Sequence, residues 1–278
     1  MRLLILADIH ANAQALRAVL NHTASWRVDG IISLGDHLNY GPMPRETLAL
    51  LHDAKVRLLM GNHEERLVRM RAGDRDLNEN YNWSMLQWTS SQVGGEALGY
   101  PQEAVFSDML LTHAVPGNTN RLIRSRDAGE MDGILEALPQ TRLVCGHNHA
   151  PWRHARHGKE YVCVGSLGML EDNVGARAAF ALAGEDGVET FAIPYDPGGL
   201  KAVFVQSGLA AAAPELARAV YQVMLTGAQE LTLVFMHAVH AAAAQATLPW
   251  HSREAFALAA ERFPWTEDIS CEAFWRRA

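Results

Sequence analysis

The sequence predicts an α/β fold followed by a mostly helical C-terminal segment. Short apolar runs, typical of buried strands, alternate with helix-like segments over the first 200 residues. Polar motifs that contain glycine follow several of these runs, and after Pro197-Gly198-Gly199 the chain becomes rich in alanine. With 278 residues, of which 49% are hydrophobic and 20% charged, the chain can bury a large core and is not a largely disordered protein.

The first half of the chain alternates strand and helix. Residues 2–7 form an apolar run that is too short for a helix, and a segment with apolar residues spaced by three and four follows it. Further strands are predicted at Ile31–Leu34 and Val56–Met60, and the helix between them begins near Pro44. This alternation predicts an α/β sheet with parallel strand pairs.

The second half continues with strands and ends in a hairpin. Strands are predicted at Met109–His113, Arg142–Cys145 and Tyr161–Val164, with a helix over residues 128–138. Two apolar runs, 178–183 and 188–193, flank a Gly-Glu-Asp-Gly turn and are typical of a β-hairpin.

The proline- and glycine-rich stretch after the hairpin predicts a domain boundary. Residues 1–198 would form the α/β domain and residues 199–278 a helical extension. Aromatic side chains of the extension, such as Trp250 and Trp265, would pack it onto the first domain or against a second subunit in a homo-oligomer. They could instead cap a binding site, and the sequence does not choose between these arrangements.

Composition also limits the location and the partners of the protein. The formal net charge of −7 provides no basic surface for nucleic acid, which disfavours a nuclease acting on long DNA or RNA. Three cysteines without a Cys-x-x-Cys pair predict a reducing compartment, and we expect a cytoplasmic protein. No apolar run reaches the ~20 residues of a membrane span, so we expect no membrane partner.

Five predicted strand ends carry side chains of the kinds that bind metals. They are Asp8 with His10, Asp36, Asn62 with His63, His113, and His147 with His149. Side chains at the carboxyl ends of strands in an open α/β sheet can converge, and residues two apart in extended chain point to the same side. Each motif alone is ordinary turn chemistry, but their joint occurrence after β-type runs predicts one shared site.

These motifs resemble those of the calcineurin-like metallophosphoesterases. The matching residues are Asp8-Ile9-His10, Gly35-Asp36-His37-Leu38, Gly61-Asn62-His63-Glu64, His113 and Gly146-His147-Asn148-His149. The resemblance covers residues 1–196 and is closest to the compact bacterial branch of phosphodiesterases and phosphatases, which shares Asp-Ile-His-x-Asn and Gly-Ser-x-Gly. It implies a four-layer αββα sandwich and does not extend to residues 200–278.

The resemblance also implies a ligand set for two divalent metal ions. One ion would be held by Asp8, His10, Asp36 and His149, and the other by Asp36, Asn62, His113 and His147, so that Asp36 bridges them. Carboxylate, imidazole and amide ligands suit Mn, Fe, Zn, Co or Ni better than Ca or Mg. Two such ions less two carboxylate charges leave a net charge of about +2, which favours a phosphate ester as substrate.

The same resemblance assigns roles in hydrolysis. A hydroxide between the metals would attack phosphorus in line, with Asp36 and Asn62 in the catalytic centre, and His63 would protonate the leaving oxygen. The alternative is that His63 only caps the helix that follows it. Candidate substrate contacts besides Asn62 and His63 are Asn12, His37 and Arg121, although Asn12 could be a helix cap and the other two solvated loop residues.

One departure from a related pattern limits the choice of substrate. The protein Ser/Thr phosphatases continue Gly-Asp-x-x with Asp-Arg-Gly, whereas this chain has Asn39 and Tyr40 at those places. The carboxylate that would orient His63 and the arginine that would bind phosphate are therefore missing. The orienting group stays unassigned, unless Glu64 or a main-chain carbonyl serves.

Three functional hypotheses follow. The first is a metal-dependent phosphoesterase that acts on a small phosphodiester or phosphomonoester, nucleotide-like esters included. The second is a catalytically silent binding or scaffold protein on the same fold, and the third is an enzyme similar to the protein Ser/Thr phosphatases. The intact motif positions, His63 included, favour the first.

Overall fold

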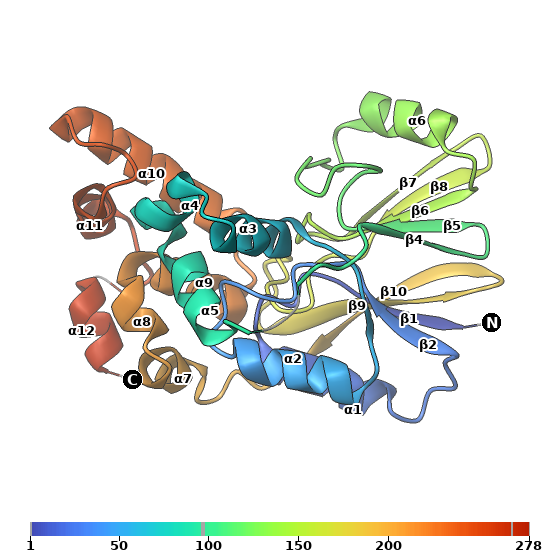
Figure 1. Cartoon of the computed structure of the whole chain (residues 1–278), viewed down its shortest axis with the longest axis horizontal. Helices are drawn as coiled ribbons and strands as arrows, with labels where there is room; N and C mark the ends of the chain where they lie inside the picture. The colour runs from blue at the N-terminus through green and yellow to red at the C-terminus, as the bar shows by residue number, and fades with distance from the viewer. Residues whose placement is uncertain (1, 96–97, 268, 278) are drawn as a thin grey trace.

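Two five-stranded β-sheets face one another in the centre of the computed structural model, which describes residues 2–95, 98–267 and 269–277. Helices cover the outer face of each sheet, and a group of further helices lies at the end of the sandwich away from the N-terminus (Figure 1). The α/β fold and the four-layer sandwich that the resemblance implied are confirmed.

The first sheet has the strand order β10-β9-β1-β2-β3. Its strands are β1 (Leu3–Leu6), β2 (Gly30–Ser33), β3 (Arg57–Leu58), β9 (Arg177–Gly184) and β10 (Gly187–Pro194). Strands β1, β2 and β3 are parallel, and β9 and β10 form the expected hairpin. The predicted parallel pairing is therefore confirmed, although β3 is shorter than the apolar run at Val56–Met60.

The second sheet has the order β4-β5-β6-β8-β7. Its strands are β4 (Glu103–Phe106), β5 (Met109–Thr112), β6 (Arg142–Cys145), β7 (Trp152–Arg156) and β8 (Lys159–Cys163). The three predicted strands form its parallel centre, while β4 and β7 are antiparallel strands at its two edges. Neither edge strand was among the predicted strands.

The apolar residues of the strands point alternately into the space between the two sheets and toward the outer helices. In β1, Leu3 and Ile5 point between the sheets, whereas Leu4 and Leu6 contact the outer helices α1 (Ala13–Thr23) and α2 (Pro44–Asp53). This alternation follows from the two-residue period of a strand. Helix α6 (Ala128–Ala137) packs on the second sheet in the same way. The central strands of each sheet are thus largely buried on both faces, and polar chemistry is left to the strand ends.

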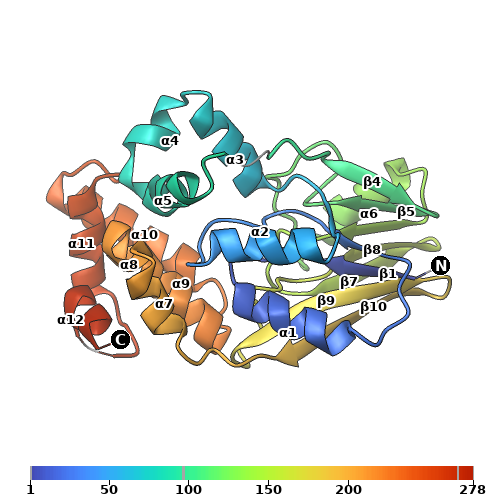
Figure 2. The same ribbon diagram turned by 60° about the horizontal axis from the view of Figure 1, so that its bottom comes forward.

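The remaining helices gather at the carboxyl ends of the parallel strands (Figure 2). After β3 come α3 (Asn62–Arg71), α4 (Arg75–Glu79), the 3₁₀ helix η1 (Tyr81–Trp83) and α5 (Ser84–Gln92). The chain after residue 199 forms α7 (Leu200–Gln206), α8 (Leu209–Ala212), α9 (Pro214–Thr226), α10 (Leu231–Ala246), α11 (Arg253–Arg262) and α12 (Cys271–Arg276). None of the helices in the described part of the chain combines the length and the apolar character needed to span a bilayer.

The C-terminal helices follow the sandwich and pack against it. One apolar cluster combines their core with Ala13, Met43, Met85 and Met169 of the preceding chain. The hydroxyl of Tyr81 also donates to Glu215 of α9 over 2.6 Å. The exact boundary between residues 198 and 199 stays a prediction.

Candidate metal centre

The predicted ligands meet where strands from both sheets end. Asp8 follows β1, Asp36 follows β2, and the loops that carry them are joined by hydrogen bonds from Asp8 N to Gly35 O and from His10 N to Asp36 O, of 3.1 and 2.9 Å. His113 follows β5, and its carbonyl accepts from Gly146 N after β6 over 2.9 Å. The loops are thus tied in pairs, and each pair belongs to one sheet.

The backbone of these loops is unusual. Asp8, His10, Asp36 and His147 all have positive φ angles, between 49° and 62°, which ordinary side chains seldom adopt. Such conformations persist where the surrounding structure holds them and are frequent at functional sites. Gly146 lets the loops approach, because a Cβ at this position would overlap the carboxylate of Asp8.

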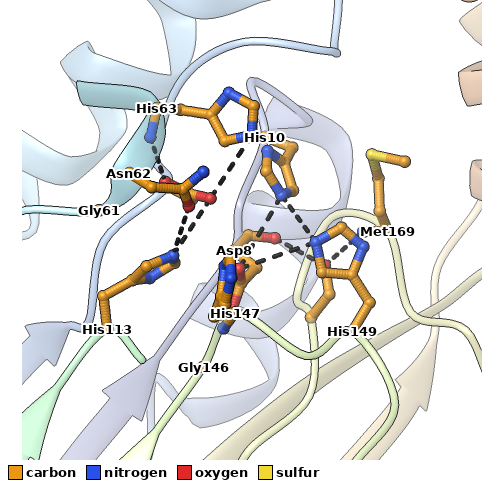
Figure 3. A network of polar contacts seen from close by, with 12 residues as sticks. Asp8, His10, Gly61, Asn62, His63, His113, Gly146, His147, His149 and Met169 are labelled. Carbon is orange, nitrogen blue, oxygen red and sulfur yellow. Dashed lines mark hydrogen bonds and ion pairs between the residues drawn. The ribbon is translucent and has the colours of Figure 1, made fainter. Parts of the chain in front are cut away.

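Asp8, His10 and His149 form the first group of candidate ligands (Figure 3). The Nε2 atoms of His10 and His149 lie 2.9 Å apart, and Asp8 Oδ1 lies 3.9 and 3.7 Å from them. Asp8 Oδ2 accepts from His147 N, but Oδ1 is buried without a hydrogen-bond partner among the described residues. Two ring nitrogens and one free carboxylate oxygen therefore face a common point.

Asp36, His113 and His147 form the second group, and Asn62 lies against it. His113 Nε2 is 3.3 Å from Asp36 Oδ2, and Asn62 Oδ1 lies 2.9 Å from both of these atoms and 3.2 Å from His147 Nδ1. His113 Nδ1 lies 3.2 Å from the carbonyl of Leu34. If that nitrogen donates to the carbonyl, Nε2 turns a lone pair toward the group.

Each of the two groups could hold a metal ion. Each offers ligand atoms within 4.8 Å of one another, and Asp36 also belongs to a third such group with His10 and His63, so it borders both. Lone pairs that face each other at these distances repel, unless a proton or a cation lies between them. Oxygen and imidazole ligands in this arrangement suit divalent transition metals.

Burial and neighbouring charges shift the pKa values of the candidate ligands in different directions. Burial raises the pKa of Asp8 to about 6 and lowers that of His147 to about 3. Burial also opposes ionisation of Asp36 and His113, but their mutual attraction outweighs it. The pKa of Asp36 therefore lies well below its usual range, and that of His113 rises to about 9. The site favours ionised Asp36, and His113 must lose a proton before it can bind a metal.

His63 lies beside both groups and is oriented by Asn39. The first turn of α3 carries His63, whose Nε2 is 3.7 Å from Asp36 Oδ2. Its Nδ1 is 2.7 Å from the side-chain amide nitrogen of Asn39, and the ring of Tyr40 lies 4.7 Å away, centroid to centroid. An amide thus holds the ring where the Ser/Thr phosphatases have a carboxylate. Gly61, not His63, is the N-cap of the helix.

Glu64 does not orient His63, although the sequence left that option open. Its buried carboxylate accepts from three main-chain N–H groups, those of Asp36 at 2.8 Å and of Leu38 and Gly61 at 3.1 Å. Glu64 therefore joins the loop of Asp36 to the start of α3. A glutamate three residues after a helix N-cap is the spacing of a capping box, which was the available sequence signal.

The helical extension reaches the edge of the site through Glu171. Its carboxylate Oε1 is 3.3 Å from His149 Nδ1, and its Oε2 accepts from the N–H of Glu230 over 2.8 Å. Gln229 adds a hydrogen bond from its side chain to Glu171 O. Although burial lowers the pKa of His149, the bond to Glu171 outweighs it and raises that pKa. No motif in the sequence indicated this contact.

Three predicted substrate contacts lie elsewhere or are already engaged. Asn12 caps α1, accepting from Ala15 N, and its amide donates to Gly168 O and Tyr195 Oη, so the cap interpretation is the correct one. His37 is fully buried near Glu64 and against Tyr100, so it is not a solvated loop residue, and its contact with a substrate stays a prediction. Arg121 forms an ion pair with Glu130 of α6, and a role in substrate binding stays a prediction.

Comparison with known proteins places this site in a family. A model of the calcineurin-like phosphoesterases matches residues 1–178. An uncharacterized protein of Methanocaldococcus jannaschii, MJ0912, is 30% identical over 178 residues, which cover 60% of this chain and 70% of that protein.

Solved structures share the fold. A metallophosphoesterase from Sphaerobacter thermophilus has a TM-score of 0.66 and 24% identity, covering 81% of this chain and 100% of that one. The hypothetical protein PH1004 from Pyrococcus horikoshii OT3 has a TM-score of 0.65 and 17% identity, covering 81% and 98%. With a family model that spans more than half of its residues and includes every motif that converges here, the chain belongs to the calcineurin-like phosphoesterase family.

Proposed function

We propose that the protein is a dinuclear metal-dependent phosphoesterase that hydrolyses small phosphomonoesters or phosphodiesters. The observation that carries this proposal is the convergence of carboxylate oxygens and imidazole nitrogens in two groups around Asp36. Membership of the calcineurin-like family supports a phosphate ester as substrate. Divalent cations held there would supply Lewis acidity, which polarises a phosphoryl group and activates water.

The surroundings of Asp36 fix its carboxylate and limit the size of the ester that can enter. The main-chain N–H of His63 donates to Asp36 Oδ1 over 2.9 Å, which fixes this carboxylate between the two ligand groups. Asp8, His10 and His113 are fully buried, and Asn62 and His63 are each 4% exposed. Because so little of the site is open, a small ester or a terminal phosphate group can enter more easily than a phosphate on a folded protein.

His63 would supply the proton for the leaving oxygen. Burial lowers the pKa of its ring to about 3, so the ring is neutral at pH 7 in the absence of an anion. A phosphate ester beside the ring would raise that pKa, because a nearby negative charge favours the imidazolium. Asn39 can serve both forms, because its Oδ1 has no other partner in the described part of the chain and can accept from a protonated Nδ1.

The experiment is hydrolysis of p-nitrophenyl phosphate and bis-p-nitrophenyl phosphate by the purified chain with added Mn²⁺, Fe²⁺, Zn²⁺, Co²⁺ or Ni²⁺. We expect turnover of at least one ester that disappears on chelation and returns when metal is added. Folded protein that binds the metals but hydrolyses neither ester would contradict the proposal and would favour a silent binding protein on this fold.

A further inference from the structure

Arg66 of α3 lies next to the candidate metal centre without an acidic partner in the described ranges. It follows Asn62 by four residues, so both side chains lie on one face of the helix. Its guanidinium lies over the ring of Trp83 at 5.2 Å, and its Nη2 donates to Asn120 Oδ1. These two contacts hold the charged group in place and leave part of its hydrogen-bonding capacity free.

The side-chain amide of Asn62 lies between a ligand group, where a metal would bind its oxygen, and the guanidinium of Arg66, which needs a hydrogen-bond acceptor. Its oxygen lies against the second ligand group, within 3.2 Å of His147 Nδ1, where a metal would need an oxygen ligand. Its nitrogen then faces Arg66, in contact with Nη1 and 3.3 Å from Nη2. Two hydrogen-bond donors thus meet with no acceptor between them among the described residues.

This conflict has two solutions. If the amide turns over, its oxygen accepts from Arg66, but the second ligand group loses its amide oxygen. If the oxygen stays with a metal, the amide nitrogen and Arg66 both need an acceptor from outside the protein. A non-bridging oxygen of a phosphate group is such an acceptor, and guanidinium is well matched to it in charge and shape.

We propose that Arg66, together with the amide nitrogen of Asn62, binds a non-bridging phosphate oxygen of the substrate. The inference rests on the proposed function, because the ligand is the ester that the metal centre would hydrolyse. The position of both residues in the first turns of α3 adds to it, since the N-terminus of a helix favours anions. The arginine that the loop after Asp36 lacks is thus supplied by a different element.

The charge of Arg66 would also favour phosphomonoesters over phosphodiesters as substrates. A phosphomonoester carries about two negative charges near pH 7 and a diester carries one, so an added cation stabilises the monoester more. We therefore expect removal of Arg66 to harm p-nitrophenyl phosphate hydrolysis more than bis-p-nitrophenyl phosphate hydrolysis. Without this residue, the preference between the two esters should shift toward the diester.

The test uses the Mn²⁺-loaded full chain as wild type, Arg66→Met and Arg66→Lys. Arg69→Met is the matched control, because Arg69 lies on the same helix and pairs only with Asp74 in the described part of the chain. Calorimetry measures binding of inorganic phosphate, steady-state kinetics measures kcat and KM for both esters, and metal content and thermal unfolding are recorded for each variant.

Loss of a charge-assisted hydrogen bond predicts phosphate binding roughly 10- to 100-fold weaker in Arg66→Met, with unchanged metal content. Arg66→Lys should recover part of the loss, and Arg69→Met should stay within about twofold of wild type. Phosphate affinity in Arg66→Met equal to wild type, or an equal loss in Arg69→Met, would overturn the inference.

The two readouts separate this inference from the proposed function. A wild-type protein that binds phosphate through Arg66 but hydrolyses neither ester would refute the proposed function and support phosphate binding by Arg66. A wild-type protein that hydrolyses esters while Arg66→Met does so equally well would support the proposed function and refute phosphate binding by Arg66.

Discussion

Replacement of Glu64 by glutamine tests how the two ligand loops are held together. The carboxylate accepts from Asp36 N, Leu38 N and Gly61 N, and the side chain is fully buried. Glutamine keeps one carbonyl oxygen and places an NH₂ group where the other oxygen was. In either orientation at least one main-chain donor loses its acceptor, which costs about 1–3 kcal/mol.

That cost predicts a measurable loss of thermal stability. At ~2–4 °C per kcal/mol for a chain of this size, Glu64→Gln should unfold roughly 2–12 °C below wild type. Differential scanning calorimetry on metal-free samples measures the difference. Glu65→Gln is the control, because the neighbouring carboxylate is only partly buried and accepts from Thr119 Oγ1 alone among described residues. An unfolding temperature of Glu64→Gln equal to that of Glu65→Gln would show that the hydrogen bonds of Glu64 do not stabilise the two loops.

Further predictions concern the groups around the metals. His63→Gln should lower kcat about 10²–10⁴-fold with metal content unchanged, because the role proposed for His63 is proton donation and not metal binding. Loss of metal would contradict this assignment. Glu171→Gln should weaken metal retention about 10- to 100-fold in a chelator competition, because Glu171 orients His149. The control is Glu189→Gln, on the exposed side of β10. Equal metal retention in the two variants would argue against a role of Glu171. Metal loading at pH 7 should release about one proton from His113, whose pKa of about 9 keeps it protonated, so metal affinity should fall as the pH drops below 9. Calorimetry in buffers of different ionisation enthalpy measures this release, and equal heats would contradict the prediction.

The pattern of apolar residues was sufficient to predict the central strands of both sheets. The strands β1, β2, β5 and β6 are buried on both faces, so their sequences are short apolar runs that end in polar motifs. The edge strand β7 reads Trp-Arg-His-Ala-Arg and is defined by its pairing with β8. A mostly polar edge strand gives no apolar run, which explains why sequence analysis missed it.

In the candidate site too, some residues could be predicted from local motifs and others could not. The candidate metal ligands could be predicted because each follows a strand in a motif of recognisable spacing. Asn39, Arg66 and Glu171 could not, because each depends on a contact that only the folded chain makes. In the link from His149 through Glu171 to Glu230, the last two residues are 59 positions apart in the sequence, and the sequence carries no motif for their contact.

The most direct test of the central claim is the metal content and anomalous diffraction of crystals of the full chain, purified without chelators. We expect two transition-metal ions per chain, one in contact with Asp8, His10 and His149 and the other with Asn62, His113 and His147, with Asp36 touching both. A folded protein without ions, or a single ion that Asp36 does not touch, would contradict it.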